Sequence, residues 1–387
     1  MMHSIPRFLS IVSLALLAGC SSLNPFSSKG PKPAELPAFE ARADVHQLWR
    51  VNIAAAETYR FQPAVADGAV YVAGERGELA RIDAKSGNVA WSTRLDRLSA
   101  GVGANDSLVA VVTRDGELVV LEASSGAERW RTPVGAEVLA APGVTNDVIL
   151  VRTSSNVVKA YETSDGSQRW VYQRDMPALT LRNASGMYVE EGGAIIGYPG
   201  GKLVGLNLGN GGPMWELTVT TPRGVTELER VADLAGAPVM EGSEVCAVAF
   251  QGRAGCFDLA NGRVLWSIEF SSSVGLDRSG RLVVVTAADD SVQALDASDG
   301  FVLWRQEPMA LRRLSRPLVV GGGVVVGDLE GYVHVLDARD GSIVGRGRAG
   351  SGAIEAAPVA LGDGSFVVQT VNGDVYAFQL RAMEGMQ

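Results

Sequence analysis

The chain has 387 residues, a formal net charge of −9 at pH 7, 46 glycines and only 3 histidines. The acidic balance argues against a nucleic-acid partner, which needs a basic face on the protein. It also argues against adsorption to anionic lipid by charge alone. With so few histidines and no second cluster of ligands near the cysteines, we expect no zinc or other metal site and little capacity for general-base catalysis.

The first 20 residues, MMHSIPRFLSIVSLALLAGC, have the pattern of an export signal. Arg7 precedes an apolar stretch at 8–18, which is too short to span a bilayer and is typical of the core of a signal peptide. The ending LAGC resembles a bacterial lipobox. That resemblance implies that residues 1–19 are a lipoprotein signal peptide and that Cys20 becomes acylated. An ordinary secretory signal with a coincidental cysteine is the alternative.

Residues 20–43 are rich in proline and serine and contain no apolar run. Such a composition predicts a flexible, semi-extended tether without a core of its own. Ser21 follows the lipobox cysteine, and in enteric-type bacteria that pattern implies the periplasmic face of the outer membrane. We therefore expect attachment to the membrane through lipid alone, because several acyl chains on one residue give stable anchoring.

A 15-residue motif then repeats along the chain. GELARIDAKSGNVAW at 77–91 is followed by GELVVLEASSGAERW at 116–130, and a seventh copy at 331–345 ends in Gly instead of Trp. An eighth start at Gly373 runs out before its tryptophan, and the missing part stands at 47–50. All seven tryptophans occupy one motif position: Trp49, Trp91, Trp130, Trp170, Trp215, Trp266 and Trp304. A period of about 40 residues indicates a repeat architecture.

Each unit contains four short β-prone runs separated by tight turns, such as the run at 69–73. Four strands in a unit of this length match one blade of a β-propeller, and no sustained helical spacing occurs. We predict an all-β, eight-bladed β-propeller of four-stranded antiparallel blades over residues 44–380, followed by a C-terminal tail at 381–387. The N-terminal strand should join the last blade and close the ring, which removes an exposed sheet edge.

The tryptophans and the acidic residues of the motif have structural explanations. A Trp on the outermost strand can cover the face of the next blade and bury roughly 150–250 Å². The acids at the hairpin position are explained by turn chemistry, because Asp side chains bond to nearby backbone; they are Asp83, Asp258, Asp296 and Asp337. We therefore assign the seven tryptophans to docking between blades and predict no catalytic residue.

Two cysteines, Cys246 and Cys256, stand on the two sides of a hairpin turn. An oxidising periplasm permits a disulfide between neighbouring strands. Register decides the outcome, because a two-residue turn at 251–252 places the cysteines on opposite faces, whereas a three-residue loop or a bulge aligns them. Two buried free thiols are the alternative.

The repeat is interrupted in two places. The step from a tryptophan position to the next motif start varies little in six cases, but it is longer after Trp170 and longest after Trp215. The excess lies at 174–186 and 218–236, in two consecutive connectors between an outer strand and the next inner strand. Both are expected on the same face of neighbouring blades, where together they form one patch. Function is expected where repeat units exceed their minimum.

The first of these connectors reads RDMPALTLRNASG. An extended chain places Leu179 and Leu181 on one side, next to Arg182, and this combination of apolar anchors and a guanidinium suits partner binding. Alternatively, both leucines fold back onto the fourth blade. The second connector is acidic through residues such as Glu229 and Asp233, and a solvated loop is its alternative explanation.

The lipobox, the Pro/Ser tether, the eight short blades and the LTLR connector together resemble the BamB family. These are the β-propeller lipoproteins of the outer-membrane β-barrel assembly machinery. The resemblance implies a non-enzymatic scaffold that binds the periplasmic POTRA domains of BamA and assists insertion of barrel precursors, with unfolded outer-membrane proteins as a further partner. It maps partner contacts onto Leu179, Leu181 and Arg182 and an acidic pair onto Asp233 and the position two later. That position is Ala235 here, so Glu229 is the alternative acid.

The tryptophan motif is also similar to the repeat of pyrroloquinoline-quinone-dependent alcohol dehydrogenases, which are likewise eight-bladed. That similarity implies calcium ligands, an acidic base, long cavity-building insertions and a disulfide between adjacent cysteines. This chain has no adjacent cysteine pair, and its blades are close to minimal length. We therefore expect no cofactor. A quinone-dependent periplasmic dehydrogenase and a propeller that binds a small molecule in its central channel are the alternatives.

Overall fold

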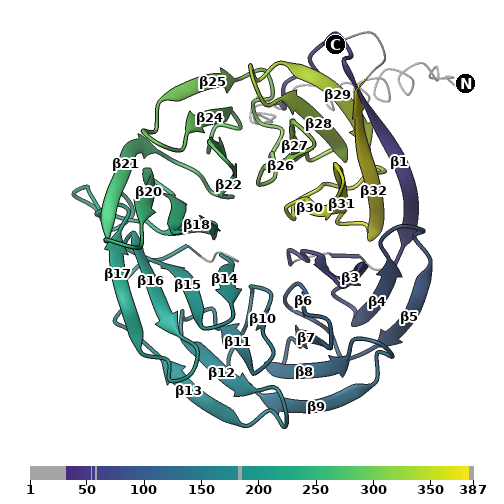
Figure 1. The fold of residues 1–387 in the computed structure, drawn as a ribbon, viewed down its shortest axis with the longest axis vertical. Helices are drawn as coiled ribbons and strands as arrows, with labels where there is room; N and C mark the ends of the chain where they lie inside the picture. The colour runs from purple at the N-terminus through teal and green to yellow at the C-terminus, as the bar shows by residue number, and fades with distance from the viewer. Residues whose placement is uncertain (1–31, 54, 57–58, 182–184, 383–387) are drawn as a thin grey trace, which may run out of the picture. The chain divides into compact units, whose positions relative to one another are not determined.

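Eight sheets, each of four antiparallel strands, follow one another around a ring (Figure 1). The computed structural model describes all residues except 1–31, 54, 57–58, 182–184 and 383–387. The predicted fold class, an all-β eight-bladed propeller, is confirmed. The described residues from Ala34 onward form one compact unit. Among the described residues, no helix has the length and hydropathy of a membrane span.

The blades follow the chain in order, with the innermost strand first. Blades 1 and 2 contain β2 (Ala64–Ala66), β3 (Ala69–Ala73), β4 (Glu78–Asp83), β5 (Val89–Arg94), β6 (Gly103–Ala104), β7 (Leu108–Val112), β8 (Glu117–Glu122) and β9 (Glu128–Pro133). Blades 3 and 4 contain β10 (Gly143–Val144), β11 (Val148–Arg152), β12 (Val158–Glu162), β13 (Gln168–Tyr172), β14 (Met187–Glu190), β15 (Gly193–Tyr198), β16 (Lys202–Asn207) and β17 (Pro213–Thr218).

The second half of the ring is built in the same way. Blades 5 and 6 contain β18 (Leu234–Glu241), β19 (Glu244–Ala249), β20 (Gly252–Asp258), β21 (Arg263–Phe270), β22 (Leu276–Ser279), β23 (Leu282–Thr286), β24 (Val292–Asp296) and β25 (Val302–Gln306). Blades 7 and 8 contain β26 (Leu318–Val320), β27 (Gly323–Gly327), β28 (Tyr332–Asp337), β29 (Ile343–Arg348), β30 (Val359–Gly362), β31 (Ser365–Gln369), β32 (Asp374–Ala382) and, as the outermost strand, β1 (Ala43–Asn52).

Sequence and burial agree most closely in the second strand of each blade. β3, β7 and β11 read AVYVA, LVAVV and VILVR, and every residue in them is buried. A strand with both faces covered carries a continuous apolar run instead of an alternating one. Outer strands such as β5 and β9 are largely exposed. The core is therefore a circle of layers between blades, not a single centre.

The ring closes by pairing the two ends of the described chain. β1 runs antiparallel to β32, with Ala43 opposite Ala382 and Asn52 opposite Asp374. Figure 1 shows β1 as the outermost strand next to β32. The strands of the ring thus begin at 43 and end at 382, slightly outside the expected range 44–380. Closure gives blade 8 its fourth strand, and the core continues across the junction from β31 and β32 to β3 and β4.

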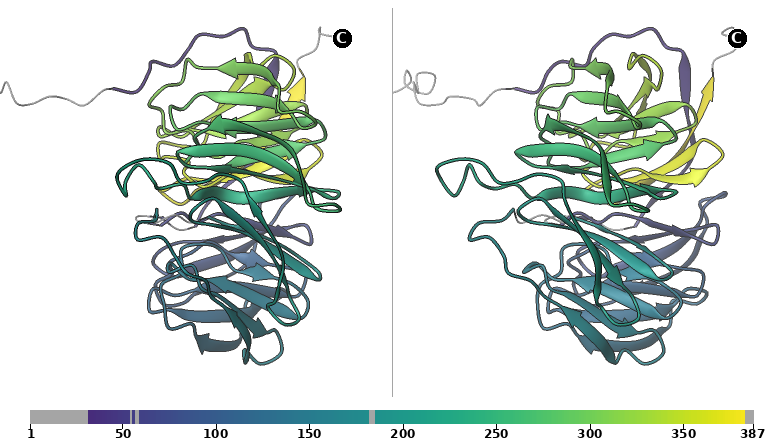
Figure 2. Two further views of the ribbon diagram at one scale, coloured as in Figure 1. Left: turned by 90° about the vertical axis from the view of Figure 1, so that its left-hand side faces the viewer. Right: turned by 60° about the vertical axis from the view of Figure 1, so that its left-hand side comes forward.

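Antiparallel pairing gives the ring two distinct faces. Each connector from an outer strand to the next inner strand leaves one face, which we call the connector face. Each hairpin between the third and fourth strands of a blade lies on the opposite face, which we call the turn face. In Figure 2 the two longest connectors project together from one side of the ring. They follow β13 and β17 and enter blades 4 and 5.

Candidate functional site

The first long connector, residues 173–186, is anchored at its base. The guanidinium of Arg174 lies 5.2 Å from the ring centre of Tyr198 and 3.2 Å from Glu216. Met176 packs against the core shared by blades 3 and 4. Beyond this base the chain bends at 178–179, and its described residues contain no strand. The expected straight alternating segment is therefore interrupted, because Met176 holds the chain down before Pro177 turns it outward.

The bend separates the two leucines. Leu179 is 48% exposed, whereas Leu181 is buried further than its neighbour at the tip, since its backbone N–H bonds to the buried Asp233. Arg182, expected to stand next to them, lies outside the described residues. Leu179 therefore faces solvent, and the backbone of Leu181 is tied to Asp233 on the second connector and not to the fourth blade.

Asp233 holds the first connector in place. Its Oδ2 accepts a hydrogen bond from the backbone N–H of Leu181, 52 residues away in sequence. One step further along, the hydroxyl of Ser185 donates to the carbonyl of Leu234 over 2.7 Å, and Arg152 donates to the carbonyl of Ser185 over 3.1 Å. These bonds fasten the two long connectors to each other and to blade 3.

Burial changes the interpretation of the expected acidic pair. Asp233 is only 3% exposed, and burial raises the pKa of its carboxyl, while the N–H of Leu181 and the charge of Arg152 oppose that shift. Ala235, two residues later, is buried in β18 opposite Val248. An acid at either position is covered by the ring. Asp233 therefore acts through the backbone of Leu181 and not as a surface charge.

The second long connector, residues 219–233, ends in a capped turn. The carboxylate of Glu229 accepts hydrogen bonds from the backbone N–H groups of Val225 (2.8 Å) and Thr226 (3.1 Å), and the Thr226 hydroxyl accepts one from the N–H of Glu229. This reciprocal pattern is a capping box. The two backbone N–H groups lower the pKa of Glu229. Glu229, expected as a partner contact, is thus also the group that shapes the tip.

This tip exposes two apolar residues that the sequence analysis did not single out. Val225 is 96% exposed and Leu228 is 70% exposed, both more than Leu179 on the neighbouring connector. The sequence signal is that Val225 and Leu228 are three residues apart in RGVTELER, and this spacing places both side chains on one turn. The acidic residues around them masked that signal.

The junction between blades 4 and 5, which the second long connector crosses, also departs from the contact pattern found at six other junctions. Six indoles donate Nε1–H to a carbonyl in the outer hairpin of the next blade: Trp49 to Ala84, Trp91 to Ala123, Trp130 to Thr163, Trp170 to Leu208, Trp266 to Ala297 and Trp304 to Ala338. Each of these rings lies over the glycine of that hairpin, so a Cβ at Gly341 would be 2.4 Å from the ring of Trp304. The glycine and the indole of the motif are thus partners across blades.

Trp215 is the exception. A Cβ at Gly205, on the neighbouring strand of the same blade, would lie 2.3 Å from its ring, whereas Gly262 in the next hairpin has no heavy atom within 4 Å. Trp215 still packs into the core between blades 4 and 5 with Val245 and Phe257. The small residue at Gly205 lets the indole lie back on its own blade.

Blade 5, which receives the second connector, contains a disulfide. Cys246 pairs directly with Cys256 across β19 and β20, with their Cα atoms 4.1 Å apart, and both are fully buried. Val248 pairs with Ala254, so the hairpin is centred on the single residue Gln251, which adopts a left-handed conformation. This odd-numbered connection is the register that aligns the two thiols on one face.

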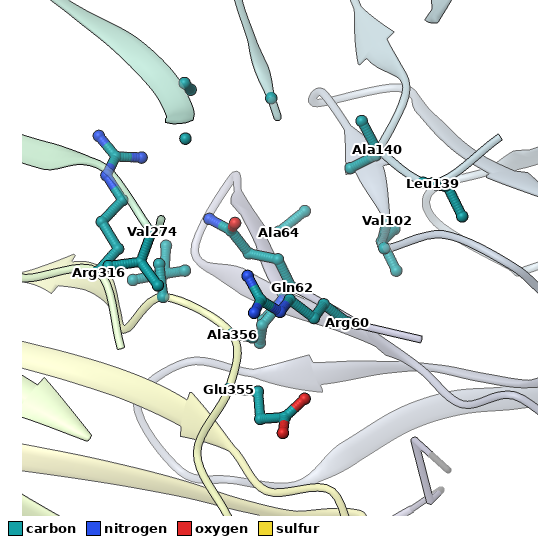
Figure 3. A pocket seen from close by; sticks show the side chains of 18 of the residues that line it. Arg60, Gln62, Ala64, Val102, Leu139, Ala140, Val274, Arg316, Glu355 and Ala356 are labelled. Carbon is teal, nitrogen blue, oxygen red and sulfur yellow. The ribbon is translucent and has the colours of Figure 1, made fainter. Parts of the chain in front are cut away.

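The central channel is a weaker candidate site. A cavity of about 280 Å³ opens there, and Figure 3 shows Arg60, Arg316 and Glu355 among the side chains around it. Its volume falls just below the range typical of small-molecule sites. Two of the charged groups are engaged: Glu355 pairs with Arg313 at 2.6 Å, and Arg316 donates to the carbonyl of Leu276 over 2.6 Å.

The acidic residues of the motif shape their hairpins. Asp83 accepts hydrogen bonds from the N–H and hydroxyl of Ser86, and Asp296 accepts the same pair from Ser298. No group of three or more His, Cys, Asp or Glu side chains that could hold a metal ion occurs in the part of the chain that the structure describes.

Comparison with known proteins gives a consistent result. The family model described as outer membrane protein assembly factor BamB matches residues 35–97, 94–306 and 276–384. The protein of that name from Burkholderia pseudomallei is 39% identical over 386 residues, covering 98% of this chain and 100% of the relative. The one from Bordetella pertussis is 37% identical and covers 94% of each chain.

Solved structures agree on the fold. The crystal structure of BamB from Moraxella catarrhalis superimposes with a TM-score of 0.79 at 24% identity, covering 87% of this chain and 99% of that one. A quinohemoprotein alcohol dehydrogenase from Comamonas testosteroni reaches 0.65 at 16% identity, covering 89% and 78%. The second likeness shows only that the propeller is shared with enzymes. The family model and the near full-length relatives show that this chain belongs to the BamB family of outer membrane protein assembly factors.

Proposed function

We propose that the ring works in outer membrane protein assembly by binding a POTRA domain of BamA with its two long connectors, while Cys20 carries the lipid that holds it at the periplasmic face of the outer membrane. The partner surface consists of Leu179, Val225 and Leu228 at the connector tips, and the family resemblance adds Leu181 and Arg182. The ring itself supplies rigidity and takes part in no chemistry. Barrel precursors are assisted through the complex, with unfolded outer-membrane proteins as further contacts.

The observation that carries this proposal is the exposure of apolar side chains on supported tips. Soluble surfaces rarely gather large apolar residues at the ends of loops unless a partner covers them. Here the loops are fixed before binding: Arg174 and Met176 hold the base of one, and the capping box of Glu229 holds the tip of the other. A loop whose backbone is ordered before binding loses little conformational entropy when it binds, so more of the contact energy appears as affinity.

Charge near the tips favours a protein partner over anionic lipid. Arg223 lies 3.5 Å from Glu269, and Arg230 lies 3.6 Å from Glu227, so the cations of the second connector have acidic neighbours. A surface of apolar anchors with locally balanced charge is typical of protein interfaces, in which central apolar contacts provide most of the binding energy.

Substitution at the tip tests this surface against a matched control. Leu179→Asp should reduce recovery of BamA with the solubilised protein at least tenfold, because it places a charge in the contact. Leu303→Asp is the control, because Leu303 is equally exposed, at 48%, on the outer strand of blade 6. Equal recovery of BamA with both variants contradicts the proposed surface.

Asp233→Asn tests the indirect role of the buried acid. The amide keeps an oxygen that accepts from the N–H of Leu181 but removes the charge near Arg152. We expect near-normal BamA binding for Asp233→Asn and a loss for Asp233→Ala, which removes the acceptor. If Asp233→Asn loses binding as completely as Asp233→Ala, the carboxylate charge itself is needed and the indirect role is wrong.

A mass measurement tests the anchor. Protein extracted from membranes should lack residues 1–19 and carry fatty acyl chains on Cys20, and Cys20→Ser should release it into the periplasm. A wild-type protein whose N-terminal mass fits an unmodified chain would refute lipid attachment while leaving the connector surface to its own test.

A further inference from the structure

Residues 34–42, which the composition suggested to be part of a flexible tether, lie along the outer edge of blade 7. At one end the N–H of Ala34 donates to the carbonyl of Ala310 over 3.0 Å, and the carbonyl of Ala34 accepts from Arg312 over 2.8 Å. Ala310 and Arg312 belong to the connector between blades 6 and 7. The segment therefore starts on the connector face.

The middle of the segment is held by one arginine and the core. Arg346 donates to the carbonyl of Pro37 over 2.8 Å, and its guanidinium lies 4.8 Å from the ring centre of Phe39. Phe39 packs against the core between blades 6 and 7, which includes Trp304. The segment thus adds an aromatic side chain to a layer that the indole already seals.

The far end reaches the turn face. The N–H of Arg42 donates to the carbonyl of Val344 over 2.8 Å, and its guanidinium lies 3.6 Å from Asp337 and hydrogen-bonds to Ser342 in the outer hairpin of blade 7. The next residue explains why the seventh motif copy lacks its tryptophan. A Cβ at Gly345 would lie 2.8 Å from the carbonyl oxygen of Ala43, so the N-terminal chain occupies the space of an indole.

The arginines that receive the segment are themselves fixed by a buried cluster. Arg312 donates to Asp328 over 2.8 Å, and Asp328 lies 2.9 Å from Nε2 of His334. Nε of Arg346 donates to Nδ1 of His334 over 3.3 Å. Asp328 and His334 are fully buried. The ring itself therefore supplies partners that orient both arginines toward the segment.

We infer that residues 34–42 are a clasp, which fixes the point where the N-terminal chain leaves the ring on the connector face and so holds that face close to the membrane. This inference rests on the proposed lipid at Cys20. With the clasp closed, the number of residues at 21–33 limits the distance between Cys20 and the ring to at most about 45 Å. With the clasp open, the limit is set by residues 21–42, is about 75 Å, and is measured from the turn face.

The inference has a consequence for partner binding. A short tether that starts on the connector face keeps Leu179, Val225 and Leu228 on the side of the ring nearest the bilayer. A partner domain that is attached to a membrane-inserted barrel is encountered on that side. Tethering raises the effective concentration of the connector tips and the partner domain for each other. An open clasp lengthens the tether, moves its origin to the other face and lowers that concentration.

The clasp can be tested without lipid, on soluble protein that begins at residue 21. Hydrogen exchange of the backbone amides at positions 34 and 42, which donate hydrogen bonds to the ring, should be at least tenfold slower in the wild type than in the double variant Phe39→Ser/Arg42→Ser. Glu40→Ser is the control, because Glu40 is exposed on the same segment, and its exchange should match the wild type. Wild-type amides that exchange as fast as those of the double variant would overturn the clasp.

The orientation is tested with lipidated full-length protein on vesicles that carry a fluorescent headgroup acceptor. A donor dye is placed at Val225→Cys on the connector face or at Asn261→Cys on the turn face of blade 5. Energy transfer to the membrane should be at least twofold more efficient from Val225→Cys, and Phe39→Ser/Arg42→Ser should remove that difference.

The two arms separate the possible failures. Equal transfer from both positions, together with slow exchange of residues 34–42, overturns the orientation and leaves the clasp. Failure of the wild type to bind vesicles refutes the lipid anchor of the proposed function, and with it the orientation, while the exchange measurement still decides whether the clasp exists.

Discussion

Two junctions of the ring, between blades 4 and 5 and between blades 7 and 8, lack the indole that docks onto a neighbouring hairpin, and they replace it differently. At the first, Trp215 lies back over Gly205 and still packs with Val245 and Phe257 of blade 5. At the second, the motif has Gly345, and the N-terminal chain passes through the vacant space. At one junction the indole is turned onto its own blade, and at the other a separate segment takes its place.

The comparison teaches that each blade interface must be filled but that its filling is interchangeable. Both irregular junctions also accommodate a segment that is not part of the regular repeat. The second long connector crosses the first of these junctions, and the N-terminal chain passes through the other. The regular junctions, by contrast, share one hydrogen bond and one glycine contact, with Nε1–O distances of 2.7–2.9 Å.

Removal of an indole should give the largest difference in stability between the regular and the irregular junctions. Trp304→Ala should lower the free energy of unfolding by about 3–5 kcal/mol, because the ring is buried and its Nε1–H bond to Ala338 is lost. Trp215→Ala should cost less, since that ring is partly exposed. Guanidinium titration measures both. Equal losses would mean that docking onto the next hairpin adds nothing to simple burial.

The disulfide should matter at the junction between blades 5 and 6, where both cysteines pack with Trp266. Replacing both Cys246 and Cys256 with alanine should lower the free energy of unfolding by about 2–4 kcal/mol, because a closed loop no longer restricts the unfolded chain. Hydrogen exchange should show the loosening in β19 and β20 first. Reductant should destabilise the wild type and leave the double variant unchanged, and an equal effect on both contradicts a role for this bond.

Two glycines allow the contact between an indole and the next hairpin to be tested by adding a single methyl group. Gly300 and Gly262 occupy equivalent hairpin positions with φ of 74° and 67°, so alanine is strained equally at both. A Cβ at Gly300 would lie 2.7 Å from the ring of Trp266, whereas Gly262 has open space. Gly300→Ala should therefore cost about 1–3 kcal/mol more than Gly262→Ala. Identical melting temperatures for the two variants would show that the contact between Gly300 and Trp266 does not stabilise the blade interface.

The buried histidine of blade 7 predicts a pH effect of smaller size. Burial lowers the pKa of His334 below its ordinary value of about 6.5, although Asp328 opposes that shift; Arg346 and Arg312 reinforce it. Below pH 6.5 the unfolded chain binds a proton that the folded ring does not, so stability falls with falling pH by at most about 1.4 kcal/mol per unit. His334→Gln should lose this component, and parallel pH profiles for the two proteins would refute it.

The number of blades could be predicted from the sequence because its signal is local and repeated. Trp, Gly and an acidic residue recur at fixed spacing, and the structure shows that Gly and Trp meet across blades. The place of the long connectors followed from the same spacing. What the spacing did not contain was the fate of individual side chains, since these depend on contacts between distant residues.

Asp233 and Trp215 show where sequence reasoning ends. The acid was expected at a surface, but a backbone N–H 52 residues earlier in the chain draws it into the ring. The indole was expected to cover the face of the next blade, and it packs there with Phe257, but it lies over a glycine of its own blade instead of the glycine of the next hairpin. Residues 34–42 were expected to be a free tether because proline and serine dominate around them. Yet Arg312, which binds the carbonyl of Ala34, follows it in the chain by 278 residues.

The pairing of β1 with β32 has a consequence for the order in which the strands can pair during synthesis. A ribosome releases the amino end first, so Arg50 in β1 emerges 324 residues before Asp374, the residue in β32 to which it donates a hydrogen bond. For that interval β1 must remain an unsatisfied edge, and contacts of such large sequence separation form slowly. A chain stopped short of β32 therefore keeps its first strand open to any other strand it meets, which makes completion of synthesis a condition for solubility.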